Sequence, residues 1–124
     1  MPIQNRDFPV GVLRLNLGDR TGDGSGGPAI HVYGPHISGS ERQLLRFDCF
    51  KVEPHYHYDP YGIDDKIDLE GDAGADSVGW SLAQLRSRLS EMVQRAGGTS
   101  EAVTDAGSEA AQSAVAELAI ALGR

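Results

Sequence analysis

The sequence has little of what secreted and membrane-spanning proteins require. It contains one cysteine, Cys49, so no disulfide can form within the chain, as is typical of proteins from a reducing compartment. No stretch approaches the run of about 18 apolar residues that a transmembrane helix needs, and the first residues lack the apolar core of a secretion signal. We therefore expect a cytoplasmic protein that does not bind membranes.

Positive charge is also scarce. Eleven Lys and Arg residues stand against 18 Asp and Glu residues, which gives a formal net charge of −7. An acidic surface repels polyanions, and this excludes nucleic acid as the principal partner. The acidic excess is concentrated between residues 48 and 76, where nine acidic side chains accompany two lysines. This composition favours a metal cation or a basic protein as the partner.

Aromatic residues make up only 6% of the 124 residues, whereas 16 residues are glycine. The length suits one domain, and the small number of large apolar residues limits its core. We expect a single domain over residues 1–98 and an alanine-rich, acidic helical tail or docking helix over residues 99–124. Because so small a core gives a thin margin of stability, self-association or a protein partner is expected.

Alternation of apolar and polar residues predicts the strands. The period of two is present over residues 8–17, 29–33 and 43–52, and shorter extended segments follow at 56–59 and 63–69. The connections between these segments are too short for helical crossovers, so the sheet is expected to be an antiparallel meander of four or five strands.

One amphipathic helix is predicted from Leu82 to Ala96, with its apolar residues within a sector of about 100°. Ser81 is the expected N-cap, and Gly97 ends the helix. A second, alanine-rich helix is expected near the C-terminus. The predicted fold class is therefore α+β, with a small antiparallel sheet packed against one amphipathic helix.

The tail could contribute in different ways. Its apolar stripe consists mostly of alanine and it has no aromatic residue, so a chain ending at Gly98 is expected to fold without it. The alternatives are that the tail forms an interface with a second copy or a partner, or that it belongs to the core.

Histidines give the most specific chemical clue. In the segment Pro-His-Tyr-His-Tyr-Asp, an extended backbone places His55, His57 and Asp59 on the same side. Two imidazoles on one strand face can chelate one cation, and Asp59, His36 or His31 would complete a three-ligand shell of the kind that zinc, iron and manganese occupy. The alternative is that the two histidines lie on the solvent-exposed side of an edge strand.

Cys49 is in phase with the apolar residues of its strand, which predicts an inert, buried thiol.

The sequence contains no complete catalytic motif, which favours a non-enzymatic role. Three functions are compatible with the sequence. We expect first a small interaction or accessory protein, or a subunit of a larger assembly. The alternative is a metal-binding protein or metal-dependent enzyme that uses His55 and His57, and the third is a toxin-like or immunity-like protein that binds a basic partner.

Overall fold

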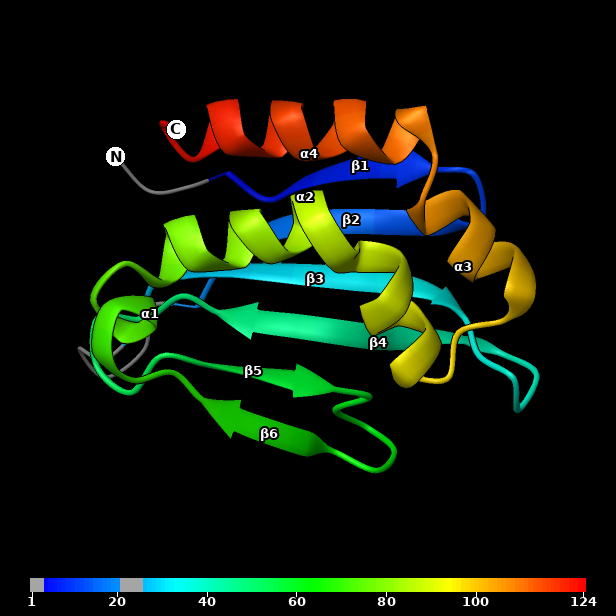
Figure 1. The fold of residues 1–124 in the computed structure, drawn as a ribbon, viewed down its shortest axis with the longest axis horizontal. Helices are drawn as coiled ribbons and strands as arrows, with labels where there is room; N and C mark the ends of the chain where they lie inside the picture. Colours follow the sequence, from blue (N-terminus) through cyan, green and yellow to red (C-terminus); the bar gives the residue numbers. More distant parts are fainter. Residues whose placement is uncertain (1–3, 21–25) are drawn as a thin grey trace.

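The computed structural model describes residues 4–20 and 26–124. Within these residues the chain has an α+β fold, in which six strands precede four helices (Figure 1). The strands are β1 (Arg6–Val10), β2 (Leu13–Asp19), β3 (Pro28–Pro35), β4 (Glu41–Asp48), β5 (His55–Tyr58) and β6 (Asp65–Asp68). The helices are α1 (Gly71–Ala75), α2 (Ser77–Arg95), α3 (Ser100–Ala106) and α4 (Glu109–Ala121).

The strands pair in sequence order and every pair is antiparallel, so the α+β class and the meander are confirmed. The described sheet nevertheless has six strands where four or five were expected. The additional strand comes from a hairpin inside residues 8–17, where Gly11 has a φ of 58° and separates β1 from β2. A Cβ atom at Gly11 would collide with the carboxylate of Asp105, which accepts a hydrogen bond from the Val12 N–H at 2.9 Å.

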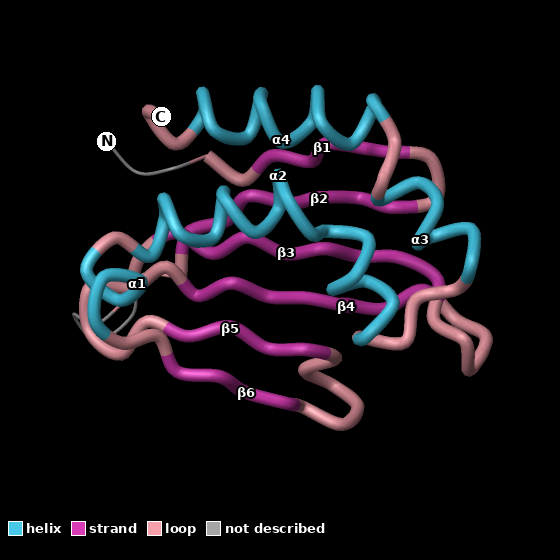
Figure 2. The backbone as a smooth tube through the Cα atoms, viewed as in Figure 1, coloured by secondary structure: helices cyan, strands magenta, loops and turns pink. Residues whose placement is uncertain are grey.

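The core lies between the sheet and the helices. In Figures 1 and 2, α2 passes in front of the central strands and α4 runs beside β1. Alternate strand residues point towards these helices, as the period of two requires. The largest fully buried apolar side chains of the strands and helices are Phe47, Tyr58, Leu13, Leu15, Leu17, Ile30, Leu44, Leu45, Leu82, Leu85, Met92 and Leu118.

Helix α2 confirms the expected apolar stripe but begins earlier than predicted. Its N-cap is Asp76, whose carboxylate accepts from the Gly79 N–H at 3.2 Å, so the assignment of Ser81 as the N-cap is wrong. Asp76, which directly follows α1, supplies a capping carboxylate five residues before Ser81, which is instead buried inside the helix. Non-helical backbone at Arg88 interrupts the helix, and Gly97, with a φ of 89°, follows its end.

The last 26 residues dock onto the sheet as two helices. Helix α3 contacts β2 and α2, and α4 contacts β1 and α2. Ser108 caps α4 by accepting from the Ala111 N–H at 3.2 Å. The tail side chains that join the hydrophobic core are Ala102, Ala106, Ala111, Ala114, Val115, Leu118 and Ala119. None of the described helices is both long and apolar enough to cross a membrane.

Candidate metal centre

The sheet face opposite the helices carries polar side chains. Neighbouring strands align one row of them, which consists from β2 to β5 of Asn16, His31, Arg46 and His57. In the adjacent row, Asp48 of β4 pairs with His55 of β5. Because side chains on a strand alternate between faces, the intervening Phe47 and Tyr56 point into the core. The β4–β5 pair therefore brings four ionisable side chains to one place.

Three of these side chains form a candidate metal site. Asp48, His55 and His57 each offer one ligand atom, and the three atoms lie within 4.8 Å of one another. Oδ2 of Asp48 is 2.8 Å from Nε2 of His55 and 3.5 Å from Nε2 of His57. Two ligand atoms on one tetrahedral zinc ion, each about 2.0 to 2.2 Å from the metal, are about 3.3 Å apart. The separations of 2.8 and 3.5 Å lie on either side of this value, so the carboxylate is close enough to each histidine to share an ion with it.

Hydrogen bonds on the outer side of the site orient both imidazole rings. Nδ1 of His55 is 2.7 Å from the carbonyl oxygen of Glu53, and Nδ1 of His57 is 2.7 Å from Oδ1 of Asp64. Both partners are acceptors, so each Nδ1 carries a proton and donates it. Metal-binding histidines are commonly held in this way, with the second nitrogen free to coordinate the ion. In this site the second nitrogens are the two Nε2 atoms that face Asp48.

The carboxylate is held from its outer side as well. Oδ1 of Asp48 accepts from the guanidinium of Arg20 at 3.3 Å, and the Asp48 side chain is only 1% exposed. Two of the residues that hold the rings also have left-handed backbone, since φ is 53° at Glu53 and 49° at Asp64. Such strain costs about 1 kcal/mol or more at a residue with a side chain, and it persists where the surrounding structure requires it. In this protein the strained turns place the two acceptors.

Positively charged groups lie next to the three candidate ligand atoms. Nε2 of His55 and Oδ2 of Asp48 are 2.8 Å apart, a distance that needs either a proton or a cation between them. Arg46 contributes further charge, because its Nε donates to Oδ2 of Asp48 at 3.1 Å and its Nη2 lies 3.0 Å from Nε2 of His57. Burial lowers the pKa of His57, against the raising effect of its bond to Asp64. A lowered pKa favours the neutral imidazole, which is the form that binds metals.

Asp59 and His36 lie in a different cluster. Strand β5 ends at Tyr58, and Asp59 has a φ of 49°, so the alternation that would place it beside the histidines stops one residue earlier. Oδ2 of Asp59 accepts from Arg42 at 3.0 Å and lies 3.8 Å from Nε2 of His36. Among the described residues it is Asp48, from β4, that the structure brings to the histidine pair.

The sequence does carry a signal for Asp48. Arg46 and Asp48 alternate with the apolar Phe47, just as the two histidines alternate with Tyr56. If the two strands form a hairpin with their apolar residues on one face, their polar residues must share the other face.

His31 lies on the same face and provides a prediction about acid stability. Its Nδ1 is 3.0 Å from Oδ1 of Asn16, and burial lowers its pKa from 6.5 to about 4, an effect that Asp48 opposes and Arg46 reinforces. Between these two pH values the unfolded chain binds a proton at this ring that the folded chain does not. Stability should therefore fall as the pH decreases from about 6.5 to about 4.

This expectation can be checked by urea denaturation of the metal-free protein at pH 7 and pH 5. The loss of stability should be smaller in His31→Gln than in the wild type, and the ring resonances of His31 should titrate near pH 4. A His31 ring that titrates at its ordinary pH of about 6.5 would contradict it.

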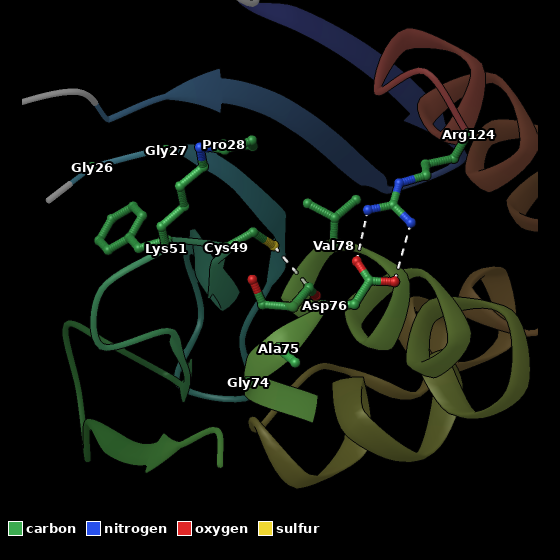
Figure 3. A pocket seen from close by; sticks show the side chains of 12 residues that line it. Gly26, Gly27, Pro28, Cys49, Lys51, Gly74, Ala75, Asp76, Val78 and Arg124 are labelled. Carbon is green, nitrogen blue, oxygen red and sulfur yellow. Dashed lines mark hydrogen bonds and ion pairs between the residues drawn. The ribbon is translucent and has the colours of Figure 1, made fainter. Parts of the chain in front are cut away.

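A separate cavity of about 560 Å³ lies beside Cys49, where the start of β3 and the end of β4 meet the start of α2 (Figure 3). Asp76 and Arg124 form a bidentate salt bridge in the wall of this cavity, with N···O distances of 2.6 and 3.1 Å. The Cys49 sulfur is 3.4 Å from the hydroxyl of Ser81 and 3.7 Å from the carbonyl oxygen of Ser77. Burial raises the pKa of Cys49 to about 11, which favours the protonated thiol at neutral pH, and the expected burial of Cys49 is confirmed.

Comparison with protein families gives one match that covers nearly all of the chain. The family is described as a domain of unknown function, DUF7700, and its model matches residues 7–122. The matched region includes the whole sheet from Asp7 onwards, the candidate metal site and helices α1 to α4. Neither the curated proteins nor the solved structures provide a match.

Proposed function

We propose that this chain, which belongs to the DUF7700 family, is a metal-binding protein that holds one divalent transition-metal ion through Asp48, His55 and His57. The observation that carries the proposal is the combination of two features. Three ligand atoms converge within 4.8 Å, and each ligand side chain is also hydrogen-bonded on the side away from that point. A solvated cluster of acidic and histidine side chains would have no need of the second feature.

The ligand set narrows the choice of metal. Two imidazole nitrogens and one carboxylate oxygen suit zinc, iron(II) and manganese(II), whereas calcium and magnesium prefer oxygen ligands alone. Three protein ligands leave one position of a tetrahedral zinc ion open, as in catalytic rather than structural zinc sites. Zinc is the first probe because it does not change its oxidation state.

Titration calorimetry with zinc tests this proposal. The wild-type protein should bind one zinc ion, and His55→Ala and His57→Ala should each weaken the affinity by at least about 100-fold, because loss of a supporting residue alone commonly costs 10- to 100-fold. His36→Gln is the matched control, since His36 lies in the cluster with Asp59 and should leave zinc binding unchanged.

Two results would contradict the proposal. One is a wild-type protein that binds none of the three metals, and the other is stoichiometric zinc that persists in the His55→Ala, His57→Ala double variant. Circular dichroism of each variant shows whether the fold is retained. The accessory and toxin-like functions expected from the composition stay predictions, because no contact or distance in the described residues bears on them.

A further inference from the structure

The guanidinium of Arg46 competes for the same atoms that would bind the metal. Its Nε donates to Oδ2 of Asp48 at 3.1 Å, and its Nη2 donates to Nε2 of His57 at 3.0 Å. The direction of the second bond is fixed, because arginine has no acceptor and Nδ1 of His57 already carries the ring proton. Arg46 therefore uses two of the three atoms assigned to the metal.

A metal ion and Arg46 cannot both use Nε2 of His57, and they would repel each other at Oδ2 of Asp48. The single lone pair on Nε2 of His57 serves either the metal or a hydrogen bond, and a metal on Oδ2 of Asp48 would face a guanidinium at close range. Arg46 must then give up its contact with His57 when the ion binds, and repulsion between the two cations weakens its contact with Asp48. Its Cα stays in the middle of β4, paired across the sheet with His31 and His57, so the released donors remain beside the metal.

The loaded site would carry an excess of positive charge. The divalent ion and the guanidiniums of Arg20 and Arg46 together bring four positive charges, against the two carboxylates of Asp48 and Asp64. This local excess contrasts with the net charge of −7 on the chain as a whole. The Arg46 side chain is 14% exposed, as is that of His55, whereas Asp48 is only 1% exposed, so solvent reaches the guanidinium beside the buried carboxylate.

We propose that the metal-loaded site binds a small oxyanion, a carboxylate or phosphate group that takes the open coordination position and is held by Arg46. This inference rests on the proposed metal site. One oxygen of the anion would complete the shell of the metal, and a second would accept from the guanidinium, whose paired donors match the geometry of carboxylates and phosphates. The ligand or substrate of the protein is then a small molecule that carries such a group.

Calorimetry on the zinc-loaded protein tests the inference, with inorganic phosphate in one series and acetate in the other. At least one anion should bind the loaded wild-type protein at least about 10-fold more tightly than the metal-free protein, in which Arg46 is engaged with Asp48 and His57. The comparison of the two series identifies which oxyanion the site prefers.

Arg46→Met separates the anion site from the metal site. This variant removes the competing cation and keeps an unbranched side chain, so it should bind zinc at least as tightly as the wild type. Its affinity for the anion should fall by about 10-fold or more. Arg14→Met is the matched control, because Arg14 lies on β2, bonds to Asp7 at 3.2 Å and stacks on Tyr33, and it should leave anion binding unchanged.

The outcomes distinguish the two proposals. A wild-type protein that takes up zinc but binds neither anion contradicts the anion site alone, as does Arg46→Met with the anion affinity of the wild type. Absence of zinc binding, seen before any anion is added, overturns the metal site and the anion site together.

Discussion

Removal of residues 99–124 is expected to abolish cooperative folding. Helix α4 lies along β1 and contacts it, and the Phe8 and Val10 side chains of β1 are each only 2% exposed in the intact chain. Burial of Val115 and Leu118 from the tail contributes about 2 kcal/mol each, and five buried alanines add to this. The lost stability is comparable with the whole free energy of unfolding of a small domain, about 5 to 15 kcal/mol.

Two point variants isolate the packing of α4 from the length of the chain. Leu118→Ala should lower the free energy of unfolding by about 2 to 5 kcal/mol, because Leu118 is completely buried. Ile120→Ala, two residues further along the same helix, should change it by less than about 0.5 kcal/mol, because Ile120 is 76% exposed. Thermal melting and light scattering provide the measurements. A truncated chain that melts like the intact protein would show that α3 and α4 serve an interface rather than the core.

Asp48→Asn is expected to have the largest effect of any single substitution at the site. The amide keeps the shape of the side chain but removes the charge that faces Arg20, Arg46 and both histidines. Zinc affinity should fall by more than about 100-fold. The metal-free protein should also lose about 3 kcal/mol of stability, because the buried negative charge is removed and the cationic groups around it lose their partner.

Asp68→Asn is the matched control for this substitution. Asp68 pairs with His55 across β5 and β6, but its side chain is 67% exposed and its nearest basic group, Lys66, is 3.5 Å away. The control should leave both zinc affinity and the urea midpoint close to the wild-type values. Equal effects of the two substitutions would mean that the acidic surface, rather than the Asp48 site, attracts the metal.

Much of the sheet could be predicted because alternation and short connections act locally. The hairpin at Gly11 could not, because Val-Gly-Val lacks the turn signal of an Asn-Gly or Asp-Gly pair. The carboxylate of Asp105 stabilises this turn, because it accepts a hydrogen bond from the backbone N–H of Val12, 93 residues earlier in the chain. The packing of the tail could not be predicted for a similar reason, since alanines are weakly apolar in sequence but pack against β1 and α2 once the chain is folded.

The two histidines of the candidate site could be predicted from the sequence, whereas the proximity of Asp48 could not. The spacing of His55 and His57 is a property of one strand, so it is visible in the sequence. The choice between Asp48 and Asp59 depends on where β5 ends and on the register of β4 against β5, in which Asp48 opposes His55. This register follows from the packing of both strands against the helices, and the number of residues between Asp48 and the histidines does not determine it.

X-ray absorption at the zinc edge of the loaded protein tests the central claim most directly, because it reports the atoms bound to the ion. The spectrum should show nitrogen and oxygen neighbours at about 2.0 to 2.1 Å, with the outer-shell scattering of two imidazole rings. His55→Ala should reduce that imidazole signal by half. A shell of water oxygens alone, or a sulfur neighbour at about 2.3 Å, would contradict the assignment of Asp48, His55 and His57 as the metal ligands.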